Sequence, residues 1–253
     1  MEIVLELERT AAAHWRGTEE EWLGEWLLRA ADGFTGRANS ALPLGDPGLP
    51  LDAALGYVAG WYRARGLPAM IAVPLPLSDD APVGGLDDEL ADRGWGIRPG
   101  PAFVMVADLP LALAGSGLPA GSVVAADASP DEEWLARYHY RGVDSQPPVL
   151  RDVLTSAQEQ AFISIRAESG VLAIARLSIA EGWAGLTAVE VDPGCRRAGL
   201  GTAITAAACA EAVARGIRRV FLQVEVGNAG ARALYERCGF RYSHRYHYRT
   251  AAS

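Results

Sequence analysis

The chain has little of the residue types from which disulfide-linked and metal-held folds are built. It contains three cysteines among 253 residues, at Cys195, Cys209 and Cys238, an odd number without the paired spacing of a zinc site. Free thiols are typical of a reducing compartment, so we expect a cytoplasmic protein. Of the four histidines, only His244 and His247 are closely spaced, and their place among tyrosines near the C-terminus favours a structural role. We therefore predict no metal site.

Long apolar runs and an excess of positive charge are also missing. No uncharged apolar run approaches the roughly 18 residues of a membrane helix, and the mixed segment 1–9 does not resemble a signal peptide. The formal net charge is −8, which disfavours a nucleic-acid partner. We expect a soluble protein with no membrane and no nucleic-acid partner, in which positive charge is gathered locally if a polyanion binds.

The most informative segment that is present is Arg196–Gly201, with the sequence RRAGLG. It lies between the apolar run Leu186–Val191, which predicts a strand, and an Ala-rich stretch from Thr202, which predicts a helix. The first N–H groups of a helix lack partners and lie at the positive end of its dipole, so they can bind phosphate. Gly199 and Gly201 remove side chains that would block the approach. The segment therefore predicts a phosphate-bearing, nucleotide-type ligand.

Other nucleotide-binding loops do not fit this spacing. The third glycine of the dinucleotide fingerprint is missing, and so is the Gly-Lys-Ser/Thr end of the triphosphate loop. The pattern Arg-x-x-Gly-x-Gly, preceded by Val189–Pro193, resembles the acetyl-CoA loop of the GNAT superfamily of N-acetyltransferases. The string ARALYERCGF at Ala231–Phe240 is similar to the family's A-x-x-L-Y-x-x-x-G-F ending. The resemblance extends from about Ser122 to the C-terminus.

The resemblance implies an α/β fold, a GNAT-like mixed and twisted sheet flanked by helices, with acetyl-CoA as the co-substrate. It implies that the backbone of Val189 and Val191 holds the pantetheine or thioester and that Asn228 contacts the cofactor. Asn228 also fits an ordinary turn. The implied pyrophosphate site comprises the loop and the start of the next helix: Arg196, Arg197, Ala198, Gly199, Leu200, Gly201 and Thr202.

Two side chains are the candidates for the chemistry. The resemblance implies that Tyr235, four residues before Gly239, is the general acid for the leaving thiolate; the alternative is a tyrosine that packs a helix against the sheet. Glu190, on the strand beside the thioester, is the candidate base for the amine. Its Val-Glu-Val context also fits a solvent-facing strand residue. Glu225 is a rival base, and a water chain would need neither.

The first half carries a weaker copy of the element order of the second. A helix over 51–65 ends at Gly66, and a strand over 69–75 and a short helix over 87–93 follow. In the second half a helix ends at Gly216 before the next strand. The alternative is that helix, glycine, strand and helix are simply a common α/β order. The second half as a whole predicts strands over 122–127, 160–167, 170–179, 183–191, 219–226 and 240–248, and helices over 130–140, 148–157, 202–215 and 229–237.

This repeat predicts two tandem GNAT-like domains, a degenerate one over 1–110 and a catalytic one over 122–253. The Pro- and Gly-bearing segment 109–121 would link them. At the same 150-residue offset (216 − 66), the cofactor loop corresponds to Asp46–Leu51, which carries an acid and two prolines. Counted back from Gly94, as Tyr235 is counted back from Gly239, the position that matches Tyr235 is Leu90. We expect the first half to have no chemistry of its own and to form a wall of the substrate cleft.

The run Gly33–Ser40 is harder to interpret. Its two glycines, Arg37 and Asn39 could line a substrate site, but a tight hairpin with a polar turn is the favoured alternative. The nearby Trp22 and Trp26 are expected in the core.

Taken together, the sequence predicts an acetyl-CoA-dependent N-acetyltransferase that moves an acetyl group directly to an amine of a small molecule or peptide. The alternatives are an inactive CoA-binding sensor or scaffold and an acyltransferase that uses a longer acyl-CoA. The amine acceptor is not identified by the sequence, and both a monomer and a homodimer are compatible with it.

Overall fold

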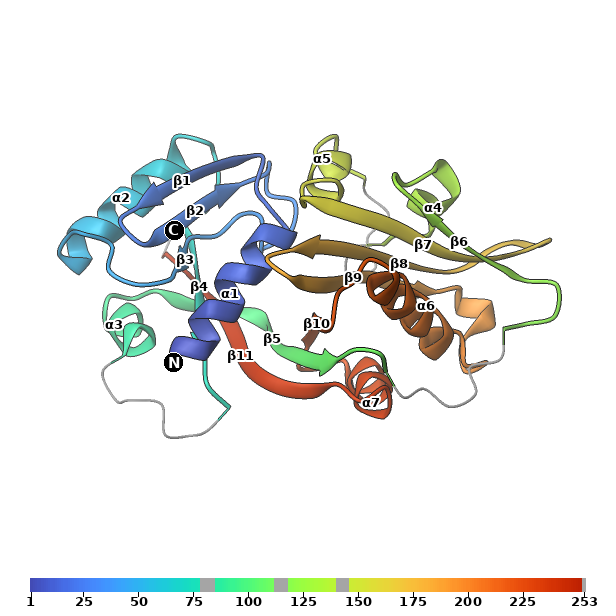
Figure 1. Ribbon diagram of the computed structural model, residues 1–253. Helices are drawn as coiled ribbons and strands as arrows, with labels where there is room; N and C mark the ends of the chain where they lie inside the picture. The colour runs from blue at the N-terminus through green and yellow to red at the C-terminus, as the bar shows by residue number, and fades with distance from the viewer. Residues whose placement is uncertain (78–84, 112–117, 140–145, 252–253) are drawn as a thin grey trace.

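The computed structural model describes residues 1–77, 85–111, 118–139 and 146–251 (Figure 1). The first half contains α1 (Glu2–His14), β1 (Glu19–Leu23), β2 (Trp26–Ala30), β3 (Leu42–Pro43), α2 (Leu51–Arg63), β4 (Met70–Leu75), α3 (Leu86–Asp92) and β5 (Gly96–Asp108). The second contains β6 (Val123–Asp127), α4 (Glu132–Arg137), α5 (Leu150–Leu154), β7 (Glu159–Ala167), β8 (Gly170–Ala180), β9 (Trp183–Val191), α6 (Leu200–Ala214), β10 (Arg219–Glu225), α7 (Ala229–Arg237) and β11 (Arg241–Thr250). No helix among the described residues is long and apolar enough to cross a membrane.

The two halves share one eight-stranded sheet, in which the strand order is β4-β11-β5-β10-β9-β8-β7-β6. Strand β5 from the first half lies between β10 and β11 of the second and pairs antiparallel with both. Strand β11 in turn lies between β4 and β5 of the first half. In Figure 1 the red C-terminal strand accordingly runs in among the blue and green elements of the first half. Each half therefore completes the sheet of the other.

The element order α2, β4, α3, β5 in the first half repeats as α6, β10, α7, β11 in the second. The parallel contact before each unit also recurs. Ala41 bridges Ile71 of β4 in parallel, as Ala184 of β9 pairs in parallel with Val220 of β10. Strands β1, β2 and β3 form a separate antiparallel sheet. The proposed domain boundaries at 1–110 and 122–253 would fall between the two units, but the sheet is continuous across them.

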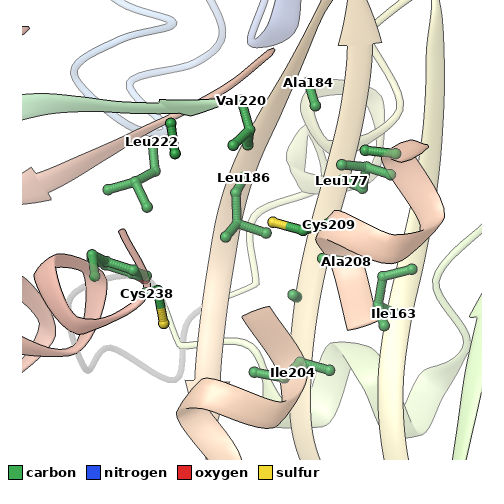
Figure 2. Close-up of a cluster of buried hydrophobic side chains, with 14 of the residues drawn as sticks. Ile163, Leu177, Ala184, Leu186, Ile204, Ala208, Cys209, Val220, Leu222 and Cys238 are labelled. Carbon is green, nitrogen blue, oxygen red and sulfur yellow. The ribbon is translucent and has the colours of Figure 1, made fainter. Parts of the chain in front are cut away.

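Helices cover both faces of the large sheet. On one face the Ala-rich α6 packs on β7, β8 and β9, and its small side chains let the helix approach the strands closely (Figure 2). Tyr235 of α7 joins this cluster. On the other face α1 contacts β4, β8 and β9, and Trp134 of α4 and Leu154 of α5 lie in a cluster with Phe162 of β7.

Several predicted elements differ from the observed ones. Helix α4 begins after Asp131, not at Pro130, because the Asp131 carboxylate accepts a hydrogen bond from Trp134 N at 2.8 Å and caps the helix there. Helix α6 begins at Leu200, two residues before the predicted start. Trp26 is buried as expected, but Trp22 is 52% exposed. Parts of the predicted link 109–121 and of the helix 130–140, namely 112–117 and residue 140, lie outside the described residues.

Candidate functional site

The central feature of the site is the separation of two parallel strands. β9 and β10 pair only from Ala184/Val220 to Leu186/Leu222. Beyond Leu186, β9 carries a bulge: Thr187 pairs with Arg176 of β8 and Glu190 with Ile174, so two residues of β9 oppose one of β8. Ala188 in the bulge has φ +52°. The bulge bends β9 away from β10 and leaves the facing backbone edge of β9 without a strand partner.

A cavity of about 350 Å³ lies where the strands part. Val224 and Tyr235 in its wall belong to the cluster under α6 and α7. Gln223 alternates with Val224 along β10, and therefore points to the opposite face, where α1 packs. The cavity is lined from both faces of the sheet, so a ligand can reach through the gap from one face to the other. Its other lining residues include Trp15, Arg37, Ala102, Tyr138, His139, Val189, Glu190, Glu225, Asn228, Ala231, Tyr246 and Tyr248.

Tyr235 lies on α7 at the wall of this cavity and is 7% exposed. Its ring packs edge-to-face on Phe240, with 5.7 Å between the centroids. Burial, with the nearby Cys238 and Cys209 thiols, raises the pKa of the phenol above its usual range. The side chain therefore packs α7 on the sheet, as the structural alternative required, and also presents a phenol that keeps its proton at neutral pH.

Glu190 faces the side of the sheet opposite to α6, because it pairs with Ile174 of the cluster under α4 and α5. Its carboxylate accepts a hydrogen bond from the backbone N–H of His139 at 2.7 Å, and the His139 ring lies 3.3 Å from its second oxygen. Burial raises the pKa of Glu190, and the His139 hydrogen bonds oppose this shift. Glu225, the rival base, lines the same cavity.

The glycine loop at the start of α6 contains two residues with a positive φ. Arg197 has φ +66° and Gly199, the N-cap residue, has φ +82°. The first amide to bond inside the helix belongs to Ala203, which donates to the Gly199 carbonyl at 3.0 Å. The amides of the preceding turn therefore remain available to a ligand. The four loop residues Arg196, Arg197, Ala198 and Gly199 are exposed.

The loop lies next to α7. A Cβ on Gly201 would come within 3.3 Å of the Leu234 side chain, so the glycine lets α6 and α7 approach closely. A salt bridge of 2.6 Å between Arg137 of α4 and Asp192 fixes the other side of the loop.

The predicted cofactor residues divide into two groups in space. Val189 and Asn228 line the cavity, and both Val189 and Val191 pack against the cluster under α6. The side chain of Asn228 caps α7 by accepting a hydrogen bond from Ala231 N at 3.0 Å, so its predicted turn role and a place at the cavity coexist. The loop residues from Arg196 to Thr202 lie outside the cavity lining.

The first half was expected to form a wall of the substrate cleft, and it does line this cavity, but sequence reasoning did not identify most of the residues that do so. Trp15 follows α1, and Arg37 lies in the irregular loop between β2 and β3, which is not the expected tight hairpin. Tyr246 and Tyr248 come from β11. Only the Gly33–Ser40 run gave a signal, as the substrate-site alternative.

The remaining cysteine and histidine residues have structural partners. Cys209 and Cys238 are buried under α6, and burial raises the pKa of the Cys209 thiol to about 12. His244 lies 2.7 Å from Glu8, and His247 lies 2.8 Å from Asp87. Within the described ranges, no three His, Cys, Asp or Glu side chains form a cluster that could hold a metal ion.

The chain is similar to known proteins in sequence and in fold. The family model described as "Probable histone acetyltransferase Rv0428c C-terminal" matches residues 3–249. The chain is 32% identical to the probable histone acetyltransferase Rv0428c of Mycobacterium tuberculosis, covering 98% of this chain and 74% of that protein. It is 27% identical to the uncharacterized N-acetyltransferase YobR of Bacillus subtilis, covering 98% and 99%. The solved GCN5-related N-acetyltransferase of Kribbella flavida superposes with a TM-score of 0.72 at 20% identity, covering 99% of this chain and 96% of that one.

Proposed function

The chain belongs to the family of the Rv0428c C-terminal acetyltransferase region and is an N-acetyltransferase of GNAT type, and from this premise we propose that it transfers an acetyl group directly from acetyl-CoA to an amine of a small molecule or peptide. The observation that carries the proposal is the cavity between β9 and β10, which brings Glu190 and Tyr235 into one lining from opposite faces of the sheet.

Acetyl-CoA fits the elements on the α6 face. The free amides at the start of α6, with Arg196 and Arg197 beside them, offer the donors and the positive charge that a pyrophosphate needs. The edge of β9 that β10 leaves unpaired offers backbone groups at Val189 and Val191 to the pantetheine amides. Asn228 at the cavity is proposed as a further contact.

The acceptor amine is proposed to enter from the opposite face. An alkylamine has a pKa of about 10.4, so its deprotonation at pH 7 costs about 4–5 kcal/mol. Glu190 accepts that proton, directly or through water, and its raised pKa brings it closer to the task of a base near neutral pH. Tyr235, held protonated by burial, donates to the departing thiolate. The donor for the oxyanion is assigned to the free backbone edge of β9.

The first test is calorimetric titration with acetyl-CoA on the wild-type protein and on two matched variants. Gly199→Asp places a carboxylate in the loop, whereas Gly216→Asp makes the same change, at the same φ of +82°, beyond the other end of α6. We expect wild type and Gly216→Asp to bind and Gly199→Asp to lose binding. Equal binding by both variants would show that the loop does not hold the pyrophosphate.

Turnover separates an enzyme from a CoA-binding sensor. The assay is release of free CoA thiol with a panel of amines, among them a lysine peptide, because the relative Rv0428c is named a probable histone acetyltransferase. The chain contains no lysine, so acetylation of its own lysine side chains cannot supply a background. Binding without thiol release from any amine would favour the sensor.

A further inference from the structure

The guanidinium of Arg37 is a fixed cation in the wall of the cavity. The loop that carries it is held by Asn39, whose side chain accepts hydrogen bonds from Ala31 N and Gly33 N at 2.8 and 2.9 Å and donates to the carbonyls of Phe34 and Thr35 at 2.7 and 2.9 Å. These bonds replace a hairpin ladder. They fix the backbone conformation of the loop, and the Arg37 side chain lines the cavity from this loop.

The partners of Arg37 are neutral. Its Nη1 donates to the Gln223 side-chain oxygen at 2.7 Å, and its guanidinium carbon lies 4.7 Å from the centre of the Trp15 ring. Among the residues that the structure describes, the side-chain partners of the Arg37 guanidinium are this amide and this ring, and neither is a carboxylate. One amide leaves most of the five guanidinium N–H donors for another acceptor.

A second arginine, Arg176, lies buried behind this wall. Arg176 is fully buried and donates to the carbonyls of Leu154 and His14 and to the hydroxyl of Thr187, all neutral acceptors. The guanidinium carbon of Arg176 also lies over the Trp15 ring, 5.2 Å from the ring centre. Burial and then the charge of Arg37 lower the pKa of Arg176 to about 9. An anion bound at Arg37 would relieve this repulsion.

The carboxylates at or near the cavity do not pair with Arg37. Glu190 and Glu225 line the cavity itself, and there the Glu190 carboxylate favours the amine end of an acceptor. Glu8 borders a small pocket next to Arg37, but its carboxylate is 2.7 Å from His244. The site therefore offers negative charge for an amine and, separately, an uncompensated guanidinium.

We propose that the acceptor is a small amino acid-like molecule, in which a carboxylate accompanies the amine, and that Arg37 binds this carboxylate. This inference rests on the proposed acetyl transfer. The cavity volume suits a small ligand. Arg37 would act as the specificity-determining residue, because a bidentate Arg–carboxylate pair discriminates strongly against an uncharged analogue.

The test uses matched acceptor pairs that differ only in the carboxylate. Glycine, serine, phenylalanine and β-alanine are each compared with their amides at saturating acetyl-CoA, and a lysine-bearing basic peptide completes the panel. For wild type we expect kcat/KM for at least one acid to exceed that of its amide by about 10–100-fold. Arg37→Gln should raise KM for the acids far more than KM for the amides and so remove this preference, and Arg37→Lys should restore part of it. Arg241→Gln, an exposed site on β11, should behave as wild type.

Three other results would contradict the inference. Preference for the basic peptide, equal use of acids and amides, or an equal loss for all acceptors in Arg37→Gln would overturn the inference while leaving acetyl transfer intact. Where turnover is too slow to measure, titration of CoA-loaded protein with N-acetylated acids and their amides decides in the same way. Failure of wild type to bind acetyl-CoA would overturn the proposed function, and this inference with it.

Discussion

The Glu190 carboxylate accepts a hydrogen bond from the backbone N–H of His139 at 2.7 Å. This contact joins the bulged strand β9 to the segment that follows α4, and it holds the carboxylate at the cavity. The His139 ring lies 3.3 Å from the second oxygen of Glu190, and the positive charge of Arg137 lies near the carboxylate. Burial nevertheless raises the pKa of Glu190, which makes its protonation measurable in the pH dependence of the reaction.

Replacement of Glu190 by Gln should lower kcat/KM by about 10²–10⁴-fold, the range typical of acid–base groups. A base acts in its deprotonated form, so wild-type kcat/KM should fall as the pH drops through the raised pKa of Glu190. The variant should lose this acidic limb. Glu225→Gln is the control, since it removes the rival carboxylate in the same cavity and should keep the limb. A pH profile that changes in Glu225→Gln but not in Glu190→Gln would reverse the two roles.

Tyr235→Phe should lower kcat by about 10²–10⁴-fold and leave the acetyl-CoA dissociation constant unchanged. The phenyl ring keeps the packing on Phe240, so only the proton donor is lost. The measurements are steady-state thiol release and calorimetric titration. Tyr57→Phe on α2, which removes a phenol that bonds Glu21 at the surface, is the matched control. Full activity of Tyr235→Phe would assign the tyrosine to packing alone.

The side of the sheet that Glu190 faces could not be predicted from the sequence. Strict alternation along β9 would place Glu190 with Leu186, on the α6 face. The bulge at Ala188 and Val189 reverses the alternation and turns Glu190 to the acceptor face. Nothing in the Val-Glu-Val sequence marks the bulge, because a non-glycine residue, Ala188, adopts the positive φ. The glycine loop was accessible because its signal is local: two glycines and two arginines beside a helix start.

Contacts between residues far apart in the sequence explain the other differences between the predicted and the observed structure. Strand β5 was not predicted from its sequence, which contains Pro99, Gly100 and Pro101, yet it pairs along both β10 and β11. The placement of Arg37 in the cavity depends on its contact with Gln223, 186 residues away in the chain. Such pairs follow from how the two halves pack, and a single sequence carries no direct record of them.

His14 should make the protein less stable in acid. The ring is 1% exposed, lies 2.9 Å from Ser178 Oγ and 3.1 Å from the Ala180 carbonyl, and packs edge-to-face on Phe221. Burial lowers its pKa from 6.5 to about 4. A group whose folded-state pKa is depressed gives stability that is present above the unfolded pKa and lost as pH falls, here between 6.5 and 4. The shift corresponds to about 3 kcal/mol.

The measurement for His14 is the free energy of unfolding by urea from pH 7.5 to 4. A His14→Gln variant should be less stable at pH 7.5 and should show a shallower decline, because it lacks the buried group that takes up a proton on unfolding. Parallel curves for the two proteins would mean that His14 does not contribute to the acid dependence.

The exchange of β5 and β11 between the halves predicts that neither half folds alone. A fragment 118–253 would expose the edge of β10 that β5 covers and would leave β11 without both of its neighbours, so a row of backbone groups would lose its partners. Fragment 1–110 would lack β11 between β4 and β5. We expect each fragment alone to show no cooperative unfolding transition and no acetyl-CoA binding, and the co-expressed pair to recover both.

The control for the fragments is the full chain with a protease site inserted between residues 112 and 117 and cleaved after folding. The two pieces should stay together on gel filtration and bind acetyl-CoA as the intact chain does, because the strand pairs between the halves do not depend on the link. If fragment 118–253 alone unfolds cooperatively and binds acetyl-CoA, the second half is an independent domain. The shared sheet would then be an interface between two finished domains rather than a condition for folding.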